Sequence, residues 1–189
     1  MRTSTGLYAE LYALAQKVKL PMTQAHVNDR KDFHQHRRST FGIVIRRIGR
    51  ARALSSISSK YPKFYTALVE YGRIICPHPF TSIHVVHNLT CSPHKDRNNV
   101  GPSTVVAFGA YEGGRLMIRD LVNSASILEH DTFQSPITFN GALQEHWNTN
   151  DLVGDKYSLV YFTVKDADPN DVIYPYSSSI FEPHESREL

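Results

Sequence analysis

Short runs of strand-forming residues follow one another from residue 81 to residue 164, and they constrain the fold of this 189-residue chain more than any other feature. The clearest are 81–88, 103–110 and 157–164, in which β-branched and aromatic residues dominate or alternate with polar ones. Turns that contain Gly, Asn and Asp separate the runs. Short strands at such close spacing predict a β-sandwich or barrel.

The residues before this region have helical spacing in two places. Apolar side chains recur every three or four residues over 6–18 and 60–75, which predicts two helices, the second with Ser59 as its N-cap. Between them, 22–40 is polar and is predicted to be an exposed loop, whereas 41–45 is a short apolar strand. The side chains expected to face inward are Leu7, Leu11, Leu14 and Val18 in the first helix and Phe64, Leu68, Tyr71 and Ile75 in the second.

The length of the chain suits one domain around a single core. We predict an α+β, mainly β domain over residues 1–189. Residues 1–77 form a helical, basic N-terminal part, 78–164 form the β core, and 165–189 form a C-terminal tail. No internal repeat and no second domain boundary is apparent in the sequence.

Charge is distributed unevenly along the chain. Residues 1–80 contain 14 Lys and Arg against 4 Asp and Glu, a net charge of +10, whereas residues 81–189 carry −7. A basic half favours a polyanionic partner such as nucleic acid. Arginine side chains match the geometry of phosphate, although these arginines could equally pair with the acidic half of the chain. The densest basic cluster consists of Arg46, Arg47, Arg50 and Arg52.

The sequence predicts neither a membrane span nor export. No run of about 18 apolar residues occurs, and charged residues interrupt the N-terminus where a signal peptide would be apolar. Cys76 and Cys91 are the only cysteines, which favours a reducing compartment over a disulfide framework. We therefore expect an intracellular protein, in the nucleus or the cytoplasm, that is not secreted and binds no membrane. A monomer is compatible with the sequence, which leaves the oligomeric state open.

Three side chains form a candidate metal site. His94 and Asp96 are one residue apart after a predicted strand, and His146 follows 52 residues after His94. Two histidines and one carboxylate are the ligands that hold non-haem Fe(II) on one face and leave the other positions open. Each residue alone has a simpler reading, because His-x-Asp is common in surface loops and a histidine beside aromatic residues often lies in a core.

The order of motifs around these residues resembles the 2-oxoglutarate- and Fe(II)-dependent oxygenases. A Gly113-Gly114-Arg115-Leu116 hairpin lies between His94 and His146, and a basic residue, Lys156, follows ten residues after His146. The resemblance covers about residues 78–164. It implies a double-stranded β-helix, or jelly roll, with the N-terminal helices packed on one sheet.

The resemblance also implies the roles of individual residues. His94, Asp96 and His146 would bind Fe(II). Lys156 would pair with the distal carboxylate of the co-substrate 2-oxoglutarate, and Ser158 would donate a hydrogen bond to it. Lys156 stands where most of the family has arginine and lacks the bidentate fork, which keeps ascorbate open as an alternative co-substrate. The residues expected at the C1 end of the co-substrate are Asn88 and Thr90.

Within this superfamily, the chain resembles the TET/JBP-like nucleic-acid oxygenases. The resemblance rests on three segments, at 93–101, 139–147 and 154–162. It implies that the protein oxidises the methyl group of a 5-methylpyrimidine in DNA, foremost 5-methylcytosine, with the base flipped out or in a single strand. Asn99 would contact the base. The residues expected to contact phosphates are Arg46, Arg47, Arg50, Arg52 and Arg97.

Two other functions remain open at this stage. The same chemistry could act on a protein side chain, as in a prolyl or lysyl hydroxylase. The chain could also be a non-catalytic nucleic-acid-binding jelly roll in which the three ligand residues coincide by chance. The co-occurring motifs favour an enzyme.

Overall fold

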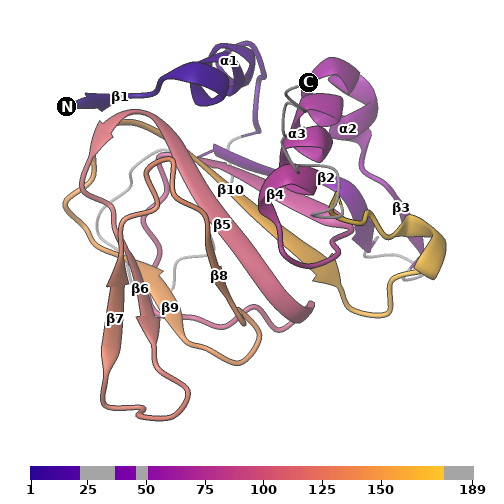
Figure 1. The fold of residues 1–189 in the computed structure, drawn as a ribbon. Coiled ribbons are helices and arrows are strands. Elements are labelled where there is room, and N and C mark those ends of the chain that lie inside the picture. The colour runs from indigo at the N-terminus through magenta and orange to yellow at the C-terminus, as the bar shows by residue number, and fades with distance from the viewer. Residues whose placement is uncertain (22–36, 46–50, 177–189) are drawn as a thin grey trace, which may run out of the picture.

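A computed structural model describes residues 1–21, 37–45 and 51–176 of the chain (Figure 1). Arg46, Arg47 and Arg50 lie outside the described residues, and so do most of the predicted loop 22–40 and the end of the predicted tail. No helix in the described part is long and apolar enough to cross a membrane.

Two antiparallel sheets make up most of the described structure. The larger sheet has the strand order β1-β5-β10-β4-β2-β3, with β8 paired to β5, and the smaller sheet has the order β7-β6-β9. The strands of the larger sheet are β1 (Arg2–Thr3), β2 (Arg37–Ile45), β3 (Arg52–Leu54), β4 (Ser82–His87), β5 (Asn99–Glu112), β8 (Ile137–Phe139) and β10 (Val153–Val164). Those of the smaller sheet are β6 (Leu116–Arg119), β7 (Ile127–His130) and β9 (His146–Asn148).

Strand β10 lies between β4 and β5 and divides the interior into two sides. Its residues alternate, as side chains of a strand must. Tyr157, Leu159 and Tyr161 are buried on one face in the main hydrophobic core. The alternate residues, from Lys156 to Val164, line a pocket on the other face.

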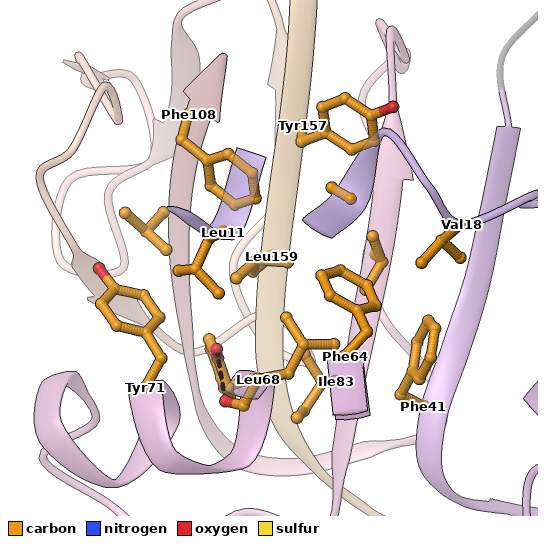
Figure 2. Packing of buried hydrophobic residues seen from close by; sticks show 14 of the residues in the cluster. Leu11, Val18, Phe41, Phe64, Leu68, Tyr71, Ile83, Phe108, Tyr157 and Leu159 are labelled. Atoms are coloured by element: carbon orange, nitrogen blue, oxygen red, sulfur yellow. Dashed lines mark hydrogen bonds between the residues drawn. The ribbon is translucent and has the colours of Figure 1, made fainter. Parts of the chain in front are cut away.

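Three helices cover the first face of the larger sheet. They are α1 (Gly6–Ala15), α2 (Ser56–Lys60) and α3 (Pro62–Ile75), and a single turn of 3-10 helix, η1 (Pro169–Asp171), follows β10. Figure 2 shows Leu11 of α1 and Leu68 of α3 meeting Ile83 and Leu159 of the sheet. Each of these four side chains is at most 1% exposed, and full burial of an aliphatic side chain contributes about 1.5–3 kcal/mol. This packing fixes the strands that line the pocket behind them.

The smaller sheet packs on the second face. Leu116 and Ile118 of β6 contact Val105 of β5 and Phe139 of β8 in a separate apolar cluster, with Val160 at its edge. The predicted fold is therefore confirmed: a mainly β, jelly-roll-like structure of curled antiparallel sheets, with N-terminal helices on one of them.

Several local predictions are wrong at their boundaries. The first helix ends at Ala15, and Ser59 lies inside α2, so that Tyr61 precedes α3 instead. Residues 37–40 belong to β2 rather than to a loop, because they pair with β4. The N-terminal part thus supplies β1, β2 and β3 in addition to helices.

Candidate metal centre and its pocket

Backbone pairing brings the two candidate histidine ligands side by side. His94 lies beyond the end of β4, and His146 begins β9. The two residues form an isolated antiparallel bridge, with the amide of His94 donating to the carbonyl of His146 at 3.1 Å and the reverse bond at 3.0 Å. Their ring centroids are 4.3 Å apart. These two hydrogen bonds hold together two residues that are 52 positions apart in the sequence.

Asp96 completes a cluster that could hold one metal ion. One ligand atom from each of His94, Asp96 and His146 lies within 4.8 Å of the other two. Each histidine places Nε2 3.7 Å from a carboxylate oxygen of Asp96. Ligand atoms about 2 Å from a common ion stand about 3 Å apart, so small side-chain movements would complete the site.

The second nitrogen of each ring is already engaged. Nδ1 of His94 lies 2.8 Å from the carbonyl of Ser92, and Nδ1 of His146 lies 3.0 Å from that of Gln144. A carbonyl only accepts, so both Nδ1 atoms carry the proton in the neutral rings. Both Nε2 lone pairs therefore face Asp96 and are available to a metal, which is the arrangement that orients histidine ligands in metalloproteins.

Two neighbours hold Asp96 in place. The backbone amide of Asp96 donates to the carbonyl of Gly141 at 2.8 Å, and Nδ2 of Asn99 donates to Oδ2 of the Asp96 carboxylate at 3.2 Å. Asn99 was predicted to contact a base. In the structure one N–H of its amide group donates to the ligand carboxylate, which leaves the second N–H and Oδ1 for that role.

Substitution of Gly141 by alanine should weaken metal binding. A Cβ at this position would lie 2.9 Å from Oδ2 of Asp96, so the carboxylate would have to move off its position. Disturbing the support of a ligand typically costs 10- to 100-fold in metal affinity, and we expect a loss of about this size in an anaerobic Fe(II) titration. Leu143→Ala is the control, because this exposed residue lies in the same turn. Equal affinities for both variants would contradict the prediction.

The two histidines titrate differently in the metal-free chain. A hydrogen bond with Cys91 is the largest cause that raises the pKa of His94 to about 9, against the lowering effect of burial. Burial lowers the pKa of His146. His94 is thus protonated near neutral pH, and a metal that binds there must displace the proton.

A pocket of about 680 Å³ opens beside the cluster, and Lys156 is its most buried charge. Lys156 is 2% exposed, and its Nζ donates to the carbonyl of Gly114 and lies 5.2 Å from the centroid of the Tyr111 ring. Burial lowers its pKa to about 8. No ion pair joins Lys156 to a carboxylate of the described residues. An ammonium group in this state suits an anionic ligand.

The other predicted residues fall into two groups. Ser158, Arg97 and Asn99 line the pocket with Lys156. Asn88 and Thr90 do not line it, whereas their neighbours Leu89 and Cys91 do. The side chain of Asn88 accepts from the backbone amide of Lys156 at 2.7 Å and so holds Asn88 beside β10. The contacts of Asn88 and Thr90 with the co-substrate stay predictions.

The sequence did not single out three polar residues of the pocket. Arg38, Thr40 and His84 line it from β2 and β4. His84 lies on the even-numbered side of the predicted strand 81–88, opposite Ile83 and Val85, and this alternation was the available signal. Arg38 and Thr40 were hidden in the polar segment that was read as a loop.

Comparisons with known proteins identify the fold. Neither a protein-family model nor a curated protein matches the sequence. The solved structure of NgTET1 in complex with 5mC DNA is 15% identical, covers 86% of this chain and 69% of its own, and gives a TM-score of 0.53. An oxidoreductase of the 2OG-Fe(II) oxygenase family from Burkholderia pseudomallei is 16% identical, covers 82% of this chain and 76% of its own, and gives 0.54. At these identities the likeness is one of fold.

Proposed function

We propose that this chain, whose fold and His-Asp-His cluster support the 2-oxoglutarate/Fe(II) oxygenase superfamily, is a dioxygenase that oxidises the methyl group of 5-methylpyrimidines in DNA. Its foremost substrate is 5-methylcytosine. The observation that carries the proposal is the convergence of His94, Asp96 and His146, within 4.8 Å of one another, in a fold shared with such oxygenases.

The residues present fit the iron and the co-substrate. Two Nε2 atoms, with the proton of His94 displaced, and one carboxylate are a donor set for Fe(II) that leaves positions for other ligands. When bound, the iron supplies the oxidation: one atom of O₂ enters the methyl C–H bond, and the other converts 2-oxoglutarate to succinate with loss of CO₂. Lys156 and Ser158 bind and orient the co-substrate through its distal carboxylate. The apolar residues around His146, above all Phe139 at 4.8 Å between ring centroids, exclude water from the metal.

The charge of the pocket favours an anionic substrate. Among the described residues, four cations line it, at Arg38, Lys95, Arg97 and Lys156, against the single carboxylate of Asp96. A doubly charged co-substrate and the metal still leave the pocket positive, which suits a nucleic-acid strand better than an average peptide. The likeness to a structure solved with 5mC DNA points the same way. Arg46 and Arg47 remain predicted phosphate contacts.

Access to the metal decides the form of the substrate. Only an extruded base or a single strand brings a methyl group into a pocket of this kind. The pocket volume of about 680 Å³ exceeds what 2-oxoglutarate needs and lies in the range typical of ligand sites. It therefore has room for the co-substrate and one base together.

Incubation with Fe(II), 2-oxoglutarate and 5-methylcytosine DNA should yield 5-hydroxymethylcytosine, detected by mass spectrometry of the nucleosides. Single-stranded DNA should react faster than duplex DNA, because no base has to be unpaired. Parallel reactions with ascorbate in place of 2-oxoglutarate identify the co-substrate. No product on any DNA would overturn the substrate assignment. Hydroxylation of peptides instead would establish the protein-hydroxylase alternative, and nucleic-acid binding without turnover the non-catalytic one.

A further inference from the structure

Strand register brings a group of polar side chains together at one end of the pocket. Thr40 of β2 pairs with His84 of β4, which pairs with Val160 of β10. Two residues further along β4, Val86 pairs with Arg38 on one side and with Ser158 on the other.

Directly paired residues face the same side of a sheet, and β2, β4 and β10 run side by side in Figure 1. Arg38, Thr40 and His84, which we call the β2–β4 polar group, thus share the pocket face of the larger sheet.

His84 is held as a neutral hydrogen-bonding group. Its Nδ1 lies 2.9 Å from Oγ1 of Thr40, which fixes the ring. Burial is the main cause that lowers the pKa of His84 to about 4, and the charge of Arg38 adds to it. At neutral pH the ring is therefore uncharged. Nε2 has no hydrogen-bond partner among the described residues and is left for a ligand in the pocket.

Arg38 is a pocket cation without an acidic partner in residues 1–21, 37–45 and 51–176. It forms no ion pair with any carboxylate of the described chain, and its charge acts on His84. A half-buried guanidinium loses part of its hydration free energy, and no ion pair among the described residues offsets that loss. Its planar donors match a phosphate in two hydrogen bonds, which would restore the balance.

The position of the group relative to the metal defines what can occupy the space between them. Val160 and Val105 continue the row of His84 across the sheet and pack with Phe139, whose ring touches that of His146. The wall nearest the metal is thus apolar, and His84 lies one strand, about 4.8 Å, beyond Val160. A substrate that fits has an apolar carbon at the metal, a polar edge on the far side and an anionic group beside it.

We infer that Arg38, Thr40 and His84 form the substrate-recognition end of the pocket, in which His84 hydrogen-bonds the polar edge of the extruded pyrimidine and Arg38 binds a neighbouring phosphate. The inference rests on the proposed function and extends it. Thr40 is a positioning residue, since it acts by fixing the ring of His84. The co-substrate lies on the β10 side of β4, with Lys156 and Ser158.

The role of Arg38 is tested by Arg38→Gln in the full chain loaded anaerobically with Fe(II) and 2-oxoglutarate. The probe is a labelled single-stranded oligonucleotide with one 5-methylcytosine, titrated by fluorescence anisotropy at several salt concentrations. We expect about ten-fold weaker binding at low salt and a salt slope reduced by about 0.7, the value for one lost phosphate contact in a single strand. Arg38→Lys should restore part of both. Lys63→Gln, an exposed cation on α3, is the control.

The role of His84 is tested by substrate discrimination. His84→Leu should lower the ratio of kcat/KM for 5-methylcytosine over thymine about ten-fold, since a lost base contact typically has an effect of this order. His84→Gln, which keeps neutral hydrogen-bonding atoms, should recover much of it. Thermal unfolding of each variant checks that the fold persists.

The outcomes separate this inference from the function on which it rests. If the unmodified chain oxidises DNA and Arg38→Gln leaves affinity and salt slope unchanged, the inference fails and the function stands. If Arg38→Gln weakens 2-oxoglutarate binding while DNA binding persists, Arg38 serves the co-substrate and the inference is wrong. If the unmodified chain neither binds nor oxidises DNA, both fall.

Discussion

Replacement of His146 by alanine should lower the affinity for Fe(II) by more than about 100-fold and reduce product formation to background. The side chain supplies one of the three ligand atoms, and loss of a ligand exceeds the 10- to 100-fold cost of disturbing ligand support. His146 is also 6% exposed and packs edge-on against Phe139. The variant should therefore lose some thermal stability, about 1–2 kcal/mol.

Iron binding and turnover have to be measured together with folding. Anaerobic Fe(II) titration followed by desalting and metal analysis gives the bound iron, and circular dichroism at the same temperature shows that the variant is folded. The matched control is His130→Ala on β7, which removes an imidazole that does not line the pocket. Undiminished iron binding in the folded His146→Ala variant would mean that the cluster is no metal site and would favour a non-catalytic jelly roll.

Lys156→Met should have opposite effects on co-substrate binding and on stability. Methionine keeps much of the length of lysine but removes an ammonium that is 2% exposed and has no ion-pair partner in the described residues. We expect a loss of about 100-fold or more in 2-oxoglutarate affinity, because one member of a buried ion pair would be missing. Without co-substrate, the variant should melt about 2–4 °C higher, since an uncompensated buried charge is gone. A purely structural lysine would give the opposite change in stability.

The lowered pKa of Lys156 adds a pH dependence. Because the pKa falls from 10.5 to about 8 on folding, the unfolded chain binds more protons between these values. The stability of the co-substrate-free chain should therefore rise with pH across this window. Affinity for 2-oxoglutarate should fall as pH rises through about 8, as the ammonium loses its proton. Calorimetric titration over pH 7–10 tests both trends, with Lys165→Met as the exposed control.

The sequence was most informative where local spacing and chemistry agreed. The aromatic and β-branched residues of 157–164 predicted β10, and the spacing of Phe64, Leu68 and Tyr71 predicted the buried face of α3. The three ligand residues were found because His-x-Asp, a distal histidine and a following lysine occur in a fixed order. The structure joins the two histidines through one backbone bridge, with Asp96 bonded beside them to Gly141.

What escaped the sequence depends on pairing between distant strands. Residues 37–40 have a polar composition typical of loops, and only the hydrogen bonds to β4 make them a strand. No local pattern indicates that Thr40 would meet His84, so this end of the pocket was not anticipated. Asn88 and Thr90 were assigned to the co-substrate by resemblance. Residue spacing alone could not determine whether their side chains face the pocket.

The most direct test of the account is a crystal structure of the chain with Fe(II) and 2-oxoglutarate, grown without oxygen. Anomalous scattering at the iron edge locates the metal independently of the protein. We predict one iron bound by Nε2 of His94, Nε2 of His146 and one oxygen of Asp96, with 2-oxoglutarate on the open side and its distal carboxylate at Lys156. Iron elsewhere, or a pocket in which these three side chains share no ion, would contradict the central claim.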